Sequence, residues 1–208
     1  MRCVFVGLGN PTAAYALHRH NVGMMVVEAL HALARAPAWQ AKHHSLISRT
    51  AGGLLLVKPQ TYMNRSGLAV HDVLTFYKKT PDQLVVFHDD LDLPLGKIKI
   101  KVGGGHGGHN GLRDLDRLLG PDYLRVRLGI GRPVHKTQVH DYVLSPFTPD
   151  EKPAVETMIQ TLQSHWGDLQ TLPLGALQAR LGGNNSQVIH NPQKTQKSPE
   201  TPMDHSGQ

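Results

Sequence analysis

Side chains able to do acid–base and hydrogen-bond chemistry are gathered in short polar clusters of this 208-residue chain. Apolar runs precede or separate the clusters, which are rich in Gly, Asn, His and Asp. They comprise Gly7–Pro11 with His18–Asn21, then Pro59–Gly67, His88–Asp92 and Gly103–Gly111. Open α/β sheets place their binding sites just past strand ends. The clusters therefore predict one active site built from several loops.

A histidine backed by a carboxylate is the chemistry that these clusters favour. Such a pair activates water, because the carboxylate fixes the tautomer of the ring and stabilises the imidazolium. His20 and Asp89 supply the two groups from separate clusters, and the amides of Asn10, Asn64 and Asn110 can orient a carbonyl or stabilise an oxyanion. Taken singly, each residue is also explained as a turn or helix-cap residue. Several clusters together favour an active site.

Other kinds of site fit the sequence less well. Gly7-Leu8-Gly9 lacks the third glycine of a dinucleotide fingerprint, because Thr12 occupies its place. No serine lies in a G-x-S-x-G elbow, and the single cysteine, Cys3, lies in an apolar run. Activated water is therefore favoured over a covalent intermediate. A metal-dependent hydrolase is an alternative, although its His-x-x-His pair lies in a glycine loop that enforces no ligand geometry; it would use His88, Asp89, His106 and His109.

The charge of the chain points to a polyanionic partner. Lys and Arg number 22 against 16 Asp and Glu, a net charge of +6. Strict alternation over 97–102 places Lys97, Lys99 and Lys101 on one face of a strand, and Arg125 and Arg127 alternate likewise. Such faces suit phosphates. Aromatic residues are 5% of the chain, which favours contacts to a folded RNA over base stacking. A non-catalytic RNA-binding protein is the second alternative.

Alternating patterns predict the fold class. Apolar runs predict strands near 4–6, 54–57, 84–87, 97–102 and 124–130. Helical spacing predicts helices over about 21–34, after 66–67, and over 111–119, 148–169 and 175–181. The result is an α/β fold: a single-domain three-layer sandwich with a mixed, mostly parallel twisted sheet flanked by helices. Half-buried alternation over 97–102 predicts that part of the sheet is antiparallel.

The domain is expected to end near residue 182. Residues 183–208 are rich in Asn, Gln, Ser and Pro and poor in apolar side chains, so we expect this tail to be disordered. No apolar run is long enough to cross a bilayer, and the N-terminus lacks a secretory signal. We expect a cytoplasmic protein without a membrane partner.

Several motifs together resemble the bacterial peptidyl-tRNA hydrolase family. The first motif is Val6–Pro11 with Tyr15 and Arg19–Gly23, and the second is Lys58–Gly67. The third and fourth are His88–Gly96 and Gly103–Leu112. The likeness runs from Arg2 to about Leu181, with the motifs in order. Thr12 stands where the family usually has Gly, and His18 where it usually has Thr.

The resemblance implies an activity and roles for residues. The enzyme would hydrolyse the ester between a peptidyl, or otherwise N-blocked aminoacyl, group and the tRNA 3′ end, as a cytoplasmic monomer without cofactor or metal. His20 would be the general base, Asp89 its supporting carboxylate, and Asn10 would discriminate blocked from free amino groups. The substrate site would be lined by Tyr15, Tyr62, Asn64 and Asn110 with His109 beside them, and Lys99, Lys101 and Arg127 would contact tRNA phosphates. His18 would add an imidazole able to perturb the pKa of His20.

Overall fold

The structure, a computed structural model, describes residues 1–182 and builds them around one seven-stranded sheet of order β2-β3-β4-β1-β5-β7-β6. The expected disordered tail, 183–208, lies outside the described residues. The strands are β1 (Val4–Gly7), β2 (Gln40–Lys42), β3 (Ser45–Arg49), β4 (Leu55–Pro59), β5 (Leu84–Asp90), β6 (Ile98–Val102) and β7 (Leu124–Gly129). The helices are α1 (Val22–Leu33), α2 (Ser66–Phe76), α3 (Asn110–Leu119), α4 (Val139–Val143), α5 (Lys152–Ser164), α6 (Trp166–Thr171) and α7 (Leu174–Gly182).

The sheet is mixed. The central strands β4, β1, β5 and β7 run parallel to one another. The outer pairs, β2 with β3, β3 with β4, and β6 with β7, are antiparallel. Every residue of β1 is buried, as expected for a central strand covered on both faces. The predicted α/β sandwich with a mixed sheet is confirmed, with the parallel pairs concentrated at its centre.

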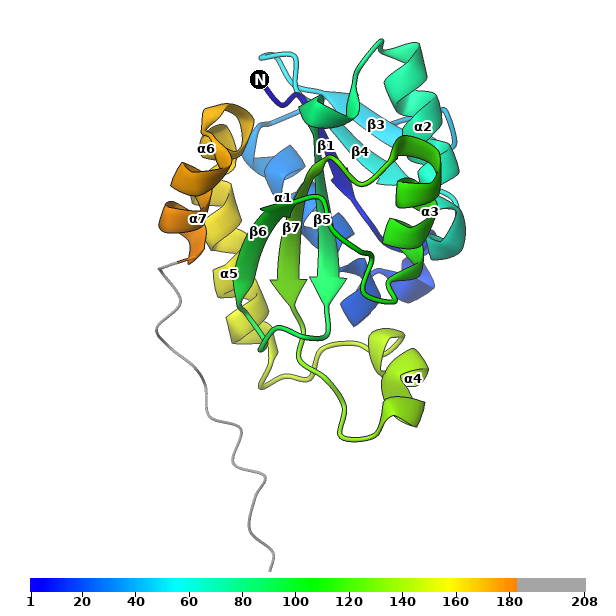
Figure 1. The fold of residues 1–208 in the computed structure, drawn as a ribbon, viewed down its shortest axis with the longest axis vertical. Coiled ribbons are helices and arrows are strands. Elements are labelled where there is room, and N and C mark those ends of the chain that lie inside the picture. The colour runs from blue at the N-terminus through cyan, green and yellow to red at the C-terminus, as the bar shows by residue number, and fades with distance from the viewer. Residues whose placement is uncertain (183–208) are drawn as a thin grey trace, which may run out of the picture.

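Helices cover both faces of the sheet and enclose two cores (Figure 1). The core on one face joins α1 and α5–α7 to the sheet, with Phe5 and Phe87 in edge contact at 5.6 Å between ring centroids. The core on the other face joins α2 and α3 to the sheet and includes Leu8 and Leu115. The apolar residues of helical spacing over 22–30 are buried in the first core. Their burial stabilises the predicted helix.

The edge strand β6 follows the predicted alternation. Ile98 and Ile100 are buried in the core on the α7 side, and Gln178 of α7 donates to the Ile100 carbonyl. Lys99, between them, is exposed. A row of lysines therefore borders the sheet beside β7.

Two parts of the fold differ from the prediction. The β2–β3 hairpin was not predicted, because its turn residues, His43 and His44, have φ of 51° and 55° without the Asn-Gly pair typical of such turns. The helix predicted over 148–169 divides at His165, where φ is −117° and ψ is 14°, into α5 and α6.

Close packing of α1 against the sheet positions the turn that carries His20. A Cβ on Gly23 would lie 2.2 Å from the Phe87 carbonyl oxygen, so only glycine allows α1 to approach β5 this closely. The 3-10 turn Arg19–Asn21 leads directly into α1. His20 is consequently brought to the end of β5, where Asp89 lies.

Thr12 is strained, and its replacement by glycine is expected to stabilise the protein. Thr12 has φ of 80° and ψ of 149°, a region that β-branched residues rarely adopt. Relief of this strain, less the entropy that glycine gains when unfolded, should raise the free energy of unfolding by about 1 kcal/mol. Urea unfolding measures it. Thr12→Ala keeps the Cβ and should show no gain, so an equal gain in both variants would contradict the explanation.

Candidate active site

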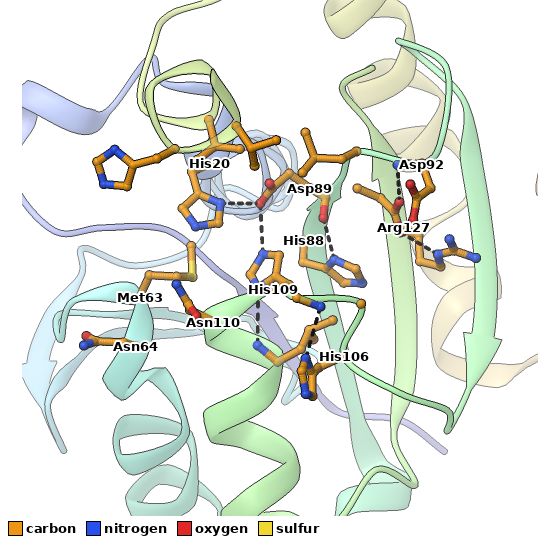
Figure 2. A pocket seen from close by; sticks show the side chains of 18 of the residues that line it. His20, Met63, Asn64, His88, Asp89, Asp92, His106, His109, Asn110 and Arg127 are labelled. Atoms are coloured by element: carbon orange, nitrogen blue, oxygen red, sulfur yellow. Dashed lines mark hydrogen bonds and ion pairs between the residues drawn. The ribbon is translucent and has the colours of Figure 1, made fainter. Parts of the chain in front are cut away.

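A cavity of about 550 Å³ lies past the carboxyl ends of the central strands, where the polar clusters meet. It is lined by the ends of β5 and β7, the segments after β1, β4 and β6, and α4. Figure 2 shows side chains from these elements facing one another across it. Most of the predicted site residues line it: Asn10, His20, Tyr62, Asn64, Asp89, Lys101, His109, Asn110 and Arg127. Tyr15 and Lys99 are not among the lining residues.

His20 and Asp89 form the predicted pair. His20 Nδ1 lies 2.8 Å from Asp89 Oδ1, and the Asp89 side chain is 3% exposed. An ionised carboxylate can only accept, so the proton is on Nδ1, and Nε2 is left without a partner among the described residues. Burial lowers the pKa of His20, but the charge and hydrogen bond of Asp89 outweigh burial and raise it above its ordinary value. The ring therefore has the tautomer and the basicity of a general base.

Asp89 serves two imidazoles. His109 Nε2 also lies 3.0 Å from Asp89 Oδ1, and the dashed lines from both rings converge on this carboxylate in Figure 2. Burial by itself would raise the pKa of Asp89, but His20 and His109 together hold it well below its usual range. Both imidazoles therefore favour the ionised form of Asp89.

The Asn10 amide is oriented by the backbone around it. Its Oδ1 accepts from the Met63 N–H at 2.9 Å, and because a backbone N–H only donates, the oxygen must face Met63. Asn21 holds the Asn10 backbone through both its N–H and its carbonyl. The Asn10 NH₂ group has no partner within residues 1–182, and Asn10 lines the cavity, so a hydrogen-bond donor is presented there.

Two of the three histidines of the metal alternative, His88 and His106, are engaged elsewhere. His88 Nδ1 donates to the Asp89 carbonyl at 2.7 Å, and burial, aided by the neighbouring His109, lowers the pKa of His88 to about 3. His106 Nδ1 accepts from the Gly108 N–H. Among the described residues, the group with ligand atoms close enough for a metal is instead His20, Asp89 and His109, whose atoms are hydrogen-bonded to one another.

The basic residues divide into exposed, paired and buried ones. Lys99 is exposed and lies beside Arg127 in the β6–β7 register. Arg127 donates to Asp90 at 2.7 Å, so part of its charge is neutralised. Burial and the neighbouring guanidinium groups lower the pKa of Lys101. Arg125, which the alternation placed with Arg127 on a phosphate-binding face, is 0% exposed and pairs with Asp116; that expectation was wrong, because α3 and the glycine loop cover this end of β7.

Tyr15 and His18 pair with each other rather than with the catalytic pair. Their rings meet edge-on at 5.3 Å, and His18 forms an isolated bridge with Pro146. The influences on the pKa of His20 are its burial and Asp89. The expected perturbation of His20 by His18 is not found.

One wall of the cavity was not predicted from the sequence. It consists of α4 and its flank, with Val139, His140, Val143 and Leu144 facing the cavity, and Arg132 and Met63 also contribute. Arg19 holds this segment: its guanidinium donates to Ser145 Oγ, the Pro146 carbonyl and Glu151, the last at 2.6 Å. These are long-range contacts, and the region 131–147 has no periodicity that would have revealed them.

Fold and site together define a mixed-sheet α/β protein with a histidine–carboxylate pair, which are the catalytic groups of a hydrolase that activates water. The family model described as peptidyl-tRNA hydrolase matches residues 4–185, and the chain belongs to this family of enzymes. The peptidyl-tRNA hydrolase of Methylobacterium sp. (strain 4-46) is 48% identical over 165 residues, 78% of this chain and 81% of that protein. That of Rhodospirillum centenum is 49% identical over 165 residues, 78% and 72% of the two chains.

A solved structure agrees with this assignment. The crystal structure of peptidyl-tRNA hydrolase from Acinetobacter baumannii superposes with a TM-score of 0.80 at 36% identity, covering 87% of this chain and 93% of that chain. The recognition made from the sequence motifs is confirmed. Within residues 1–182, no helix combines the length and the apolar character needed to cross a membrane.

Proposed function

We propose that this chain hydrolyses the ester bond between an N-blocked aminoacyl or peptidyl group and the 3′ end of tRNA, with His20 as the general base. The observation that supports this most is the bond from His20 Nδ1 to the buried Asp89, which leaves Nε2 beside the cavity with no partner in residues 1–182. Nε2 takes a proton from water, and the hydroxide adds to the ester carbonyl. The ribose hydroxyl then leaves with the proton that Nε2 returns, so the ring is neutral again at the end of the reaction.

Asn10 supplies selectivity for the blocked amino group in this proposal. Its free group is an NH₂ donor, because Met63 occupies the oxygen. A donor attracts the amide carbonyl that a peptidyl or acetyl group provides, and it repels the ammonium of an unblocked aminoacyl group. The polar match therefore discriminates between the two substrates. Asn64 and Asn110, exposed at the same end of the cavity, are further donors for the carbonyl or the oxyanion (Figure 2).

Tyr62, which is 57% exposed at the cavity, is placed to contact the substrate, and Lys99, Lys101 and Arg127 supply phosphate contacts. Binding through these cations should weaken as salt rises. Tyr15 lies off the cavity and contributes by packing against His18. A monomeric, metal-free enzyme acting in the cytoplasm completes the proposal.

The test is release of N-acetylaminoacyl groups from tRNA, with unblocked aminoacyl-tRNA beside it and with and without EDTA. We expect cleavage of the blocked ester, resistance to the chelator and negligible cleavage of the unblocked ester. Loss of cleavage in EDTA, restored by a divalent cation, would favour a metal at His20, Asp89 and His109 instead. Salt-sensitive binding without cleavage would leave an RNA-binding protein.

A further inference from the structure

The ring of His109 is held at both nitrogens. His109 is the N-cap of α3, and its Nδ1 lies 3.1 Å from the Gly111 N–H and 3.3 Å from the Leu112 N–H. Backbone N–H groups only donate, so Nδ1 is unprotonated and the proton of the neutral ring is on Nε2. Nε2 is the atom that lies 3.0 Å from Asp89 Oδ1, and the side chain is 8% exposed. The helix start thus dictates that His109 donates to Asp89.

We propose that His109 is a positioning residue that holds the Asp89 carboxylate against His20 and thereby fixes the tautomer of the general base. The inference rests on the function proposed above. It assigns His109, expected to line the substrate site, a role exerted through Asp89 rather than on the substrate. His109 cannot replace His20 as base, because protonation of Nδ1 would break both bonds at the start of α3.

The titratable groups near His20 divide into those in contact with its ring and those elsewhere around the cavity. Asp89 from β5 and His109 from the start of α3 are the titratable groups in direct contact with His20, whose ring centroid lies 4.9 Å from that of His109. On the same turn as His20, Arg19 extends away to Ser145 and Glu151. The other titratable groups that line the cavity are Tyr62, His88, Asp90, Asp92, Lys101, His106, Arg127, Arg132 and His140. Loss of the His109 donor should therefore act on His20 through Asp89.

Two substitutions separate the helix cap from the bond to Asp89. In His109→Asn, Oδ1 takes the place of Nδ1 and caps α3, but nothing reaches Asp89. In His109→Gln, Nε2 takes the place of the ring Nε2 and can donate to Asp89, but the cap is lost. Asn is a strong N-cap and Gln is not. The pair therefore distinguishes a positioning role from a purely structural one.

The measurement is the pH profile of kcat and KM on N-acetylaminoacyl-tRNA, together with Tm, for both variants. For His109→Asn we expect Tm near that of the wild type, kcat about tenfold lower, and KM little changed. The acid limb of its pH profile should move to higher pH. The charge of Asp89, no longer shared with His109, then raises the pKa of His20 above that in the wild type. His109→Gln should have the lower Tm and recover part of kcat. His44→Asn, which removes an exposed histidine paired with Asp72, should leave kcat unchanged.

Two results would overturn the inference. One is a wild-type kcat and acid limb in His109→Asn, and the other is a loss of kcat that follows Tm in both variants. Failure of the proposed function is recognised separately, because it would appear as retained activity when His20 itself is replaced. If the His20 variant is inactive and His109→Asn behaves as the wild type, only the role of His109 is wrong.

Discussion

His20→Asn is expected to lower kcat by about 10²- to 10⁴-fold, the usual contribution of a positioned general base. Asparagine places an NH₂ group where Nδ1 stood, so the buried Asp89 keeps a donor 2.8 Å away while Nε2 is lost. Stability should therefore stay close to that of the wild type. His20→Ala should lose the same activity, and it should also lower the free energy of unfolding, because Asp89 then loses a partner.

The pH dependence of the wild type provides an independent check on His20. Asp89 raises the pKa of His20 above its ordinary value, and only the neutral ring can accept a proton from water. The ratio kcat/KM should therefore rise with pH through this raised pKa and level off above it. A flat acid limb between pH 5 and 8 in the wild type, or more than about a tenth of wild-type kcat in His20→Asn, would show that another group is the base.

The sequence was informative wherever a local pattern decides the structure. The buried strands β1, β4 and β5 are short apolar runs, and Lys99 lies between Ile98 and Ile100, so period and composition sufficed. The β2–β3 hairpin lacked any such signal, because His43 and His44 adopt left-handed φ values that the surrounding fold imposes.

The chemistry of the site could be predicted from the sequence, but the prediction of its walls was incomplete. Motif resemblance and strand ends brought His20, Asp89 and Asn10 together correctly, because parallel strands deliver their carboxyl ends to one edge of the sheet. Arg19 holds the α4 wall through contacts with residues more than a hundred positions later in the sequence, and no local pattern encodes such contacts. Arg125 shares the period of Arg127, and only the covering loop and Asp116 make it a buried ion pair.

Asp89→Asn is expected to lower kcat by about 10²- to 10⁴-fold while His20 remains in place; loss of the corresponding carboxylate in serine proteases costs about 10⁴-fold. The amide is neutral and can turn an N–H toward His20, which would favour the tautomer with its proton on Nε2. Without the carboxylate, burial dominates, and burial lowers the pKa of His20. The acid limb of kcat/KM should therefore move to lower pH than in the wild type, as the plateau falls.

The direction of this shift distinguishes loss of His109 from loss of Asp89 itself. In His109→Asn the Asp89 carboxylate keeps its charge and is no longer shared with a second donor, so the pKa of His20 and the limb move up, whereas Asp89→Asn removes the charge and moves them down. Asp72→Asn is the matched control, because Asp72 accepts from His44 at 2.8 Å on the surface, and its loss should change neither kcat nor the limb. A limb that stays in place in Asp89→Asn would mean that the group titrating in kcat/KM is not His20. Opposite shifts in the two variants would identify Asp89 as the group through which the cavity sets the basicity of His20.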